Sequence, residues 1–339
     1  MTLPLVMTCG DPAGVGPEIA VAARQRLGAA VPFVWIGDPA HLPPGAQWQA
    51  VETPADAHAI PASVLPVLVH PFPAPVVPAA PDPANAAAVI AVIERAVALV
   101  QGRAASGVVT GPINKAALIG GADFGFPGHT EFLAHLAGVE RVVMMLACAE
   151  LRVVPVTIHI PLRAVPTALT PEGLEATLRI THAALMADFG IAQPRIAVAG
   201  LNPHAGEQGA MGDEDARIIA PVLDRLRTEG MALRGPLPAD TMFHAQARAR
   251  YDAAVCMYHD QALIPIKTVD FAGGVNVTLG LPFVRTSPDH GTAYDIAGQG
   301  VADPTSLMAA LRMAQEMAAR RAASVAVTVA GAGTGKAGV

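Results

Sequence analysis

The sequence predicts an α/β protein with a mostly parallel sheet. Short apolar runs that are typical of buried strands alternate along the chain with longer segments of helical pattern. This alternation is the pattern of strand–helix–strand units, in which helices cover a parallel sheet. The length of 339 residues fits one large α/β unit or two lobes, and a composition that is 52% hydrophobic supplies a large core.

The first half of the chain contains strand and helix candidates in alternation. The predicted strands are 3–8, 33–37 and 107–110, and the predicted helices are 19–27, 85–101 and a segment that opens at 129. Pro17 and Glu18 suit the first turn of the first helix, and Thr130 has the side chain of a cap for the third. Residues 40–83 are rich in proline and alanine and receive no assignment.

The first strand leads into a turn with the sequence CGDPAGVGPE. Its glycines, Gly10, Gly14 and Gly16, do not have the spacing of a dinucleotide-binding fingerprint. We therefore interpret it as a backbone turn at the edge of a cleft rather than as a phosphate cradle.

The second half of the chain begins with two adjacent strands that indicate an antiparallel or meander element. The predicted strands are 141–148, 152–160, 195–201, 253–258 and 275–280, and the predicted helices are 171–189, 214–230 and 305–321. Thr170 is placed to cap the first of these helices. No internal repeat is present.

Charge, cysteine content and hydropathy limit the partners and the compartment. The net charge of −6 is mild, and lysine and arginine are scattered, so we expect no nucleic-acid partner. The start of the chain has no cationic signal, and the uncharged run 60–81 carries seven prolines, so we expect no membrane span. Cys9, Cys148 and Cys256 are far apart and odd in number, which indicates buried thiols in a reducing cytoplasm.

The stretch 258–297 organises the candidate site. It follows the apolar run 253–257, and the carboxyl end of such a strand is where open α/β sheets place ligands. The polar groups that gather in this stretch are His259, Asp260, Lys267, Asn276, Arg285 and the turn His290-Gly291-Thr292. The alternative is an ordinary polar loop after a buried strand.

Three histidines lie at the ends of predicted strands, namely His159, His204 and His259. Three neutral imidazoles would suit Zn²⁺, Co²⁺ or another divalent transition ion and would leave positions open for a substrate. The three lie too far apart in the sequence to form a local ligand motif, and the chain has 11 histidines. Three unrelated histidines therefore remain the alternative.

Further polar residues suit an anionic ligand. His129 and Thr130 lie at a predicted helix start, which favours an anion. Lys267, Asn276 and Arg285 have the side chains that bind phosphate or carboxylate, and arginine offers a two-pronged contact. Taken singly, each could equally be a solvated surface group.

Seven motifs in the order of a known family cover the chain from residue 10 to about 300. They are GDPAGVGPE, TGPINK, PGHTEFL, GLNPHAGE, GPLPADTMF, MYHDQ and GVNVTLGLPFVRTSPDHGTA. The chain resembles the 4-hydroxythreonine-4-phosphate dehydrogenase family of pyridoxal phosphate biosynthesis. The resemblance implies an NAD(P)-dependent oxidoreductase with an isocitrate/isopropylmalate dehydrogenase-like fold. It also implies two α/β/α lobes with a cleft between them, and a homodimer whose active site lies at the subunit boundary.

The resemblance also assigns roles to residues. It implies substrate contacts at His129, Thr130, Lys267, Asn276 and Arg285. It implies one divalent metal ion per subunit (Zn, Mg or Co), held by His159, His204 and His259, with both subunits completing a site. It implies that NAD or NADP is bound by His290, Gly291, Thr292 and Asp295, and Lys267 or Asp260 is expected to move the proton.

On the same basis the chain is expected to have two lobes and a tail. Residues 1–125 with 282–325 form the nucleotide-side lobe, and residues 126–281 form the metal, substrate and dimerisation lobe. Residues 326–339 are expected to be a flexible tail.

The implied reaction is the oxidation of 4-phosphooxy-L-threonine to 2-amino-3-oxo-4-(phosphooxy)butanoate. This β-keto acid can lose CO₂ to give 3-amino-2-oxopropyl phosphate. A related dehydrogenase acting on a phosphorylated sugar acid such as phosphothreonate is one alternative. A phosphate acyltransferase of related fold and a non-catalytic phosphometabolite-binding module are the others.

Overall fold

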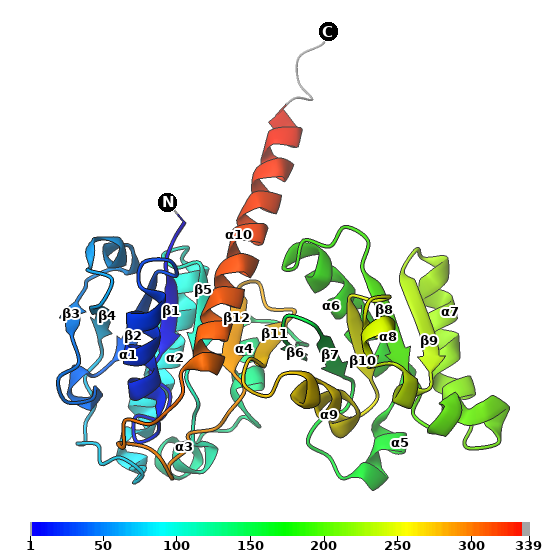
Figure 1. The fold of residues 1–339 in the computed structure, drawn as a ribbon, viewed down its shortest axis with the longest axis horizontal. Helices are drawn as coiled ribbons and strands as arrows, with labels where there is room; N and C mark the ends of the chain where they lie inside the picture. Colours follow the sequence, from blue (N-terminus) through cyan, green and yellow to red (C-terminus); the bar gives the residue numbers. More distant parts are fainter. Residues whose placement is uncertain (1, 334–339) are drawn as a thin grey trace. The chain divides into compact units, whose positions relative to one another are not determined.

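The chain divides into two compact units in a computed structural model that describes residues 2–333, with side chains through residue 324 (Figure 1). Unit 1 comprises Met1–Arg141 and Leu281–Val339, and unit 2 comprises Val142–Gly280. The predicted α/β class is confirmed, because strands and helices alternate in both units. The first boundary follows Arg141 rather than residue 125, so the segment that carries His129 and Thr130 belongs to unit 1.

Unit 1 has a fully parallel sheet with the strand order β3-β4-β2-β1-β5-β12. Its strands are β1 (Leu5–Thr8), β2 (Phe33–Gly37), β3 (Trp48–Ala50), β4 (Leu65–Val69), β5 (Gly107–Thr110) and β12 (Val284–Pro288). Its helices are α1 (Gly16–Leu27), α2 (Ala86–Gln101), α3 (Lys115–Ala122), α4 (His129–Ala137) and α10 (Thr305–Gly333). Helix α10 packs on β12, β5 and β1 with α1 beside it, whereas α2 packs on β1 and β5 and carries α3 and α4.

Four strands of unit 1 are buried along their whole length. All residues of β1, β2, β5 and β12 are buried, as expected for parallel strands covered on both faces. The edge strand β3 is fully exposed and has only three residues, and β4 contains Pro66, so both were missed within the unassigned stretch 40–83. Helix α3 and strand β12 were also missed.

One further prediction in unit 1 needs correction. Thr130 is not the cap of α4, because the helix begins one residue earlier, at His129, and its N-cap position is Gly128, which has no side chain. A segment that the sequence analysis did not consider, Pro83–Gln101, has the length and hydropathy of a membrane span. Half of that window is buried, and α2 within it packs against β1 and β5, as a core helix of a globular unit does.

Unit 2 has a mixed sheet with the order β11-β6-β7-β10-β8-β9. Its strands are β6 (Val143–Ala147), β7 (Arg152–Pro155), β8 (Arg195–Ala199), β9 (Ala232–Leu237), β10 (Ala253–Cys256) and β11 (Val275–Leu279). Its helices are α5 (Val165–Ala168), α6 (Pro171–Ala187), α7 (Ala220–Thr228), α8 (Ala245–Arg248) and α9 (His259–Val269). Strand β6 runs antiparallel to β7 and β11, which confirms the predicted antiparallel element.

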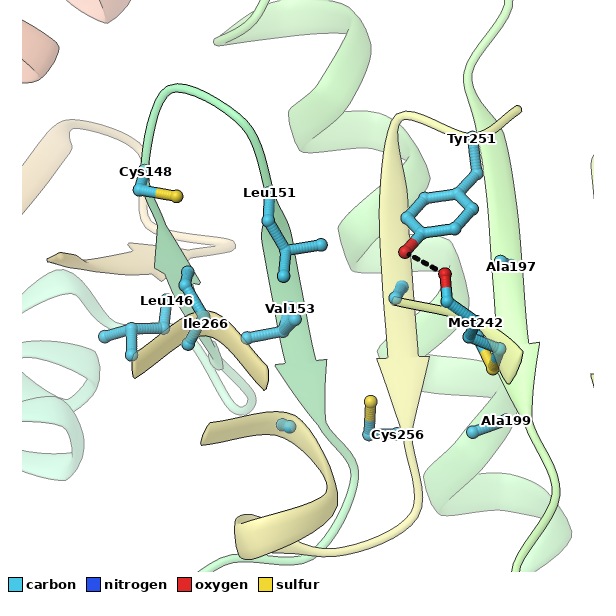
Figure 2. Packing of buried hydrophobic residues seen from close by; sticks show 12 residues of the cluster. Leu146, Cys148, Leu151, Val153, Ala197, Ala199, Met242, Tyr251, Cys256 and Ile266 are labelled. Carbon is cyan, nitrogen blue, oxygen red and sulfur yellow. Dashed lines mark hydrogen bonds between the residues drawn. The ribbon is translucent and has the colours of Figure 1, made fainter. Parts of the chain in front are cut away.

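The core of unit 2 lies where α9 packs on β6, β7 and β10 (Figure 2). Leu146, Val153 and Ile266 are buried together, so the short helix α9 is held by its apolar face. Sequence reasoning missed α9 because Pro265 interrupts its helical pattern, and it also missed β9. The polar stretch after β10 is therefore a helix and not an open loop.

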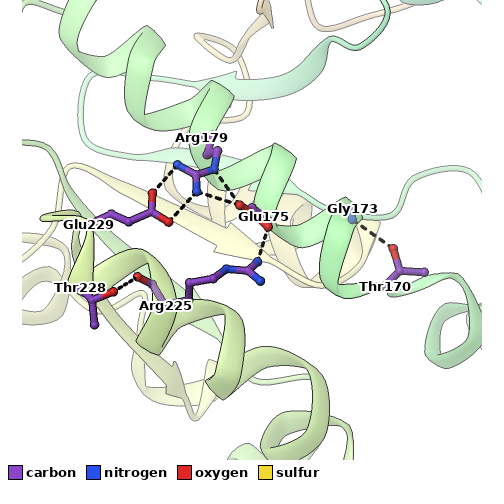
Figure 3. Close-up of polar contacts among 7 residues, drawn as sticks. All are labelled: Thr170, Gly173, Glu175, Arg179, Arg225, Thr228 and Glu229. Carbon is purple, nitrogen blue, oxygen red and sulfur yellow. Dashed lines mark hydrogen bonds and ion pairs between the residues drawn. The ribbon is translucent and has the colours of Figure 1, made fainter.

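Helices α6 and α7 are joined at the surface by ion pairs (Figure 3). Arg179 contacts Glu175 at 2.8 Å and Glu229 at 2.7 Å, and Arg225 also pairs with Glu175. The predicted cap of α6 is confirmed, because the Thr170 hydroxyl accepts a hydrogen bond from the Gly173 amide at 3.0 Å. Exposed pairs of this kind contribute little stability singly and mainly set how neighbouring helices lie.

The expected tail begins inside helix α10, which runs to Gly333 rather than ending near residue 321. The last part of that tail, residues 334–339, lies outside the described residues.

Candidate functional site

Two of the three predicted metal ligands meet in unit 2 because of strand register. Strands β7 and β10 are parallel, with Pro155 beside Cys256. The pairing continues beyond both strands, since the amides of Val156 and Thr157 donate to the carbonyls of Cys256 and Met257. His159 and His259 follow these paired segments at the same edge, and their ring centroids lie 5.7 Å apart.

The two imidazoles line a cavity of about 240 Å³. The cavity is bounded by residues on 157–165 and on 258–260. His259 is the first residue of α9, and its Nδ1 lies 2.7 Å from Oδ1 of the exposed Asp260. A carboxylate on one ring nitrogen orients the imidazole and directs the other nitrogen toward a ligand.

The third histidine, His204, lies on an unusual loop after β8. Residues 204–208 all have a left-handed backbone, and His159 also has a positive φ of 53°. Such backbones cost about 1–3 kcal/mol per non-glycine residue and persist where neighbouring contacts hold them. The buried Asp215 holds the segment just before this run, because it accepts the amides of Leu201 and Asn202 at 2.8 and 3.1 Å.

Two of the three predicted metal ligands lie near each other in one chain. His159 and His259 offer imidazole donors beside a cavity, with Asp260 to orient one of them. Within the part of the chain that the structure describes, no group of three or more His, Cys, Asp or Glu side chains is placed to hold a metal ion. A single chain therefore brings together two of the predicted ligands and leaves His204 apart from them.

Gln261 links the loops that carry the histidines, and sequence reasoning did not single it out. Its Oε1 accepts the amide of Met257 at 2.7 Å, and its Nε2 donates to the carbonyl of Gly200 at 2.7 Å. It therefore ties the first turn of α9 to the end of β8, from which the His204 loop departs. The signal was present in the YHDQ motif, in which Gln261 stands two residues after His259.

The other predicted residues of unit 2 lie on α9 and β11. Lys267 is half-buried on α9, and its Nζ lies 5.0 Å from the ring centroid of the exposed Phe271. Asn276 is half-buried on β11, within an otherwise buried strand, and pairs with Leu146 of β6.

Unit 1 contains a second cluster, centred on Arg285. This arginine is only 3% exposed on β12, next to Val108 of β5. Thr110 lies two residues further along β5, on the same face of the sheet. The guanidinium therefore reaches the Thr110 hydroxyl, and Nη2 donates to Oγ1 at 2.6 Å. Sequence reasoning did not select Thr110, although it opens the TGPINK motif.

His129 lies close enough to Arg285 for the arginine charge to affect it. Burial is the larger cause and the charge of Arg285 the smaller one, and together they lower the pKa of His129 to about 3. Burial also lowers the pKa of Arg285 to about 10, so near neutral pH the arginine is cationic and the histidine is neutral. The Nε2 atom of His129 is buried and has no hydrogen-bond partner among the described residues, which makes it available to a ligand.

The loop after β12 carries the predicted cofactor residues and is held by the glycine-rich turn after β1. The amide of Val15 donates to the carbonyl of Thr292 at 3.0 Å, and a Cβ on Gly14 would lie 2.7 Å from that carbonyl oxygen. Glu18 of α1 accepts the amides of Gly298 and Gly300. The turn therefore positions another segment of the chain, which explains the glycine at position 14.

Two features of this loop suit a dinucleotide. A Cβ on Gly291 would meet no atom within 4 Å, and its φ is not positive, so the fold itself does not require glycine there. Glycine at such a place permits close approach of a ligand. The Nε2 atom of His290 is buried without a hydrogen-bond partner among the described residues, whereas Asp295 is exposed.

Fold and site together define an α/β enzyme for a small anionic metabolite, with a buried arginine in unit 1 and paired imidazoles in unit 2. The family model described as Pyridoxal phosphate biosynthetic protein PdxA matches residues 28–314, and the chain belongs to this family.

Curated relatives and solved structures agree with this assignment. The chain is 67% identical to the 4-hydroxythreonine-4-phosphate dehydrogenase of Paracoccus denitrificans, over 94% of this chain and 98% of that protein. It is similar to the crystal structure of the Klebsiella pneumoniae enzyme of that name, with a TM-score of 0.86, 38% identity, and coverage of 94% of this chain and 100% of that one. For the Burkholderia phymatum enzyme of that name the TM-score is 0.80, with 37% identity and coverage of 94% and 99%.

Proposed function

We propose that this chain oxidises 4-phosphooxy-L-threonine to 2-amino-3-oxo-4-(phosphooxy)butanoate, which decarboxylates to 3-amino-2-oxopropyl phosphate on the route to pyridoxine 5'-phosphate. The observation that carries the proposal is the 67% identity to a 4-hydroxythreonine-4-phosphate dehydrogenase across nearly the whole chain. The buried cationic Arg285 beside the neutral His129 supports it, because the substrate has two anionic ends.

For substrate binding we propose His129, Thr130 and Arg285 in unit 1 and Lys267 and Asn276 in unit 2. Arg285 and Lys267 hold the anionic groups, and a fixed guanidinium suits phosphate or carboxylate better than a mobile ammonium does. His129 stays neutral near pH 7, so it contributes a hydrogen bond rather than a charge. Lys267 or Asp260 moves the proton of the substrate hydroxyl.

His159, His204 and His259 are proposed to hold one divalent ion per subunit. When bound, the ion supplies Lewis acidity that favours loss of the hydroxyl proton. Asp260 orients the His259 ring, and Asp215 holds the segment from which the His204 loop departs. Zn, Mg and Co are the candidate ions, and two of the three ligands lie together within one chain.

The nicotinamide cofactor, NAD or NADP, supplies the hydride acceptor and is proposed to lie on the loop with His290, Gly291, Thr292 and Asp295. Two observations support this placement. The fold does not require glycine at position 291, and Nε2 of His290 is buried. A cavity of about 650 Å³ in unit 1, lined in part by Gly298, Gly300 and Ala302, adjoins the same loop.

We propose a homodimer in which both subunits complete each site. The separation of His204 from the other two histidines within one chain supports this arrangement. In a two-fold dimer each chain can supply the same residue to the site of its partner, so both sites are completed in the same way. Mixing an inactive His204→Ala chain with an inactive Lys267→Ala chain should then restore some activity. A fully active monomer, or verified heterodimers that stay inactive, would argue against this division of the site.

A cytoplasmic location is proposed from the cysteines. Cys9, Cys148 and Cys256 are all free and buried, as predicted, and burial raises the pKa of the Cys9 and Cys256 thiols. Thiols in this state suit a reducing compartment. Fractionation of the cells that make the protein tests the location.

The test of the reaction is a turnover assay with 4-phosphooxy-L-threonine, both dinucleotides and each divalent ion. Reduced dinucleotide should appear by its absorbance, and CO₂ and 3-amino-2-oxopropyl phosphate should follow. Side-by-side turnover of phosphothreonate tests the sugar-acid alternative. The two dehydrogenases differ around the substrate amine, so faster turnover of phosphothreonate would overturn the proposal.

The acyltransferase and binding-module alternatives are not favoured, because relatives that match nearly the whole chain carry a dehydrogenase name. Either alternative would be supported by the complete absence of dinucleotide reduction under every metal condition.

A further inference from the structure

Three segments that are far apart in the sequence meet at the hydroxyl of Tyr294 in unit 1. This hydroxyl donates to Oδ2 of Asp11 at 2.8 Å and accepts a hydrogen bond from Nδ2 of Asn114 at 2.8 Å. Asp11 belongs to the turn after β1, and Asn114 caps α3 by accepting the amide of Ala117. One phenol thus joins the GDPAG, TGPIN and HGTAYD motifs.

Asp11 is a fixed and desolvated acceptor. It is 7% exposed, its Oδ1 accepts the amide of Ala13 at 2.9 Å, and its own amide donates to the carbonyl of Pro112 at 2.8 Å. Burial raises the pKa of Tyr294 to about 12, with the Asp11 carboxylate contributing, so the phenol remains a donor throughout the physiological range. Hydrogen bonds to a buried carboxylate are stronger than those between neutral groups.

These two hydrogen bonds of the Tyr294 hydroxyl, here called the tie, lie in the middle of the loop that is proposed to bind the dinucleotide. On one side the carbonyl of Thr292 accepts the amide of Val15, and on the other Glu18 accepts the amides of Gly298 and Gly300. Between these anchors the Tyr294 hydroxyl provides a side-chain contact that holds the loop to the turn after β1. Asp295, one of the proposed cofactor contacts, is the next residue.

We infer that Tyr294 is a positioning residue for the nicotinamide cofactor, because its hydroxyl, held between Asp11 and Asn114, keeps the 290–295 loop in the conformation that receives the dinucleotide. This inference rests on the proposed function. Phenylalanine at 294 would keep the ring but would leave Asp11 without this donor and give the loop more conformations. The binding-competent fraction would fall, and the apparent affinity for the dinucleotide would fall with it.

The test is Tyr294→Phe, measured first by direct titration of the protein with NADH and NADPH and then by steady-state kinetics. The dissociation constant and the KM for the preferred dinucleotide should rise about tenfold, which is near the lower end of what loss of one hydrogen bond to a charged group costs. The kcat and the KM for the phosphorylated substrate should change less than about twofold, because the loop acts on cofactor binding.

A matched control is Tyr251→Phe in unit 2. The Tyr251 hydroxyl is also buried and donates to the carbonyl of Met242 at 2.9 Å (Figure 2). Its loss should lower the melting temperature to a similar extent while leaving dinucleotide affinity unchanged. Asp11→Asn, which keeps an acceptor oxygen, should bind the dinucleotide better than Asp11→Ala, which has none.

Two outcomes would overturn the inference in different ways. If Tyr294→Phe binds the dinucleotide like the wild type and only its melting temperature falls, the tyrosine supports the fold and nothing more. If the wild type itself binds neither NADH nor NADPH, the proposed function fails together with the inference. If Tyr294→Phe does not fold, the Asp11→Asn and Asp11→Ala pair decides, and equal affinities in those two variants would overturn the role of the tie.

Discussion

Two arginines, one in each unit, lie in opposite environments. Arg285 of unit 1 is 3% exposed and donates to the Thr110 hydroxyl at 2.6 Å. The side chain of Arg179 in unit 2 is 44% exposed and lies between Glu175 and Glu229 (Figure 3). Burial lowers the pKa of Arg285, whereas hydrogen bonds to the two glutamates raise that of Arg179.

The difference in burial between the two arginines determines how strongly each charge can act on a ligand. Water screens Arg179, and its charge is already met by carboxylates on neighbouring helices, so removing it changes little. Arg285 lies where water is largely excluded, so its field on an anion is strong. Substitutions in the Arg285 cluster and at the histidine pair should therefore have large effects on binding and activity. Substitutions in the surface ion-pair network should have small effects.

The largest effect is expected at the proposed metal ligands. His159→Ala, His204→Ala and His259→Ala should each lower metal content and reduce turnover by at least about 100-fold, because even residues that only orient ligands cost 10- to 100-fold when changed. Metal analysis of the purified variants and turnover assays measure this. His244→Ala, which removes an exposed imidazole in the same unit, is the control. Full metal occupancy and activity in any one of the three variants would show that its residue is not a ligand.

Removal of the buried arginine should come next. Arg285→Ala should weaken substrate binding by about tenfold or more, since a charge-assisted contact contributes roughly 1.5–3 kcal/mol. Lys267→Ala should also weaken substrate binding. In both variants the affinity for the dinucleotide should change less than the affinity for the substrate. Substrate titration checks this, with Arg320→Ala on the exposed side of α10 as the control. Unchanged substrate affinity in Arg285→Ala would contradict the assignment.

Asp260→Asn should have a smaller effect, on metal affinity. The amide keeps the shape of the side chain but removes the carboxylate that lies 2.7 Å from Nδ1 of His259. Metal affinity should fall by about tenfold, with little change in melting temperature, because Asp260 is exposed. Metal titration with a competing chelator measures the affinity. Turnover that falls while metal affinity holds would instead favour Asp260 as the residue that moves the proton.

The stability of wild type should fall more at acidic pH than the stability of His129→Gln. The folded pKa of His129, about 3, lies below its ordinary value of 6.5, so between these values the unfolded chain binds a proton that the folded chain does not. Wild type therefore loses stability on this account as pH falls from 6.5 toward 3. His129→Gln should lose less over the same window. Melting temperatures at pH 4 and pH 7 test this, and parallel losses in both proteins would show that His129 does not contribute.

The smallest effect is expected for Arg179→Ala. The melting temperature should shift by no more than about 2 °C, because the side chain is exposed. Turnover should be unchanged, because Arg179 is not among the proposed site residues. High salt should shrink the shift further. A loss of activity comparable to that of Arg285→Ala would break the contrast between buried and exposed arginines.

Many elements could be predicted from local pattern, and the failures have physical causes. Strand β2 and helix α2 were found because their apolar residues follow strand and helix patterns and both pack into the core. Helix α9 was missed because Pro265 breaks its pattern, although packing of Ile266 on the sheet holds it. Strand β9 was missed because Gly235 and Pro236 are poor strand formers, and the segment is a strand through its pairing with β8.

The sequence by itself determined the chemical groups of this protein and the order of its motifs, because side-chain type and local apolar pattern are properties of the chain. Tertiary structure alone decided which groups meet. His159 and His259 lie together because β7 and β10 are neighbours in one register, and that register depends on the packing of a whole sheet. Tyr294 reaches Asp11 across 283 residues, and no local preference encodes a contact of that separation.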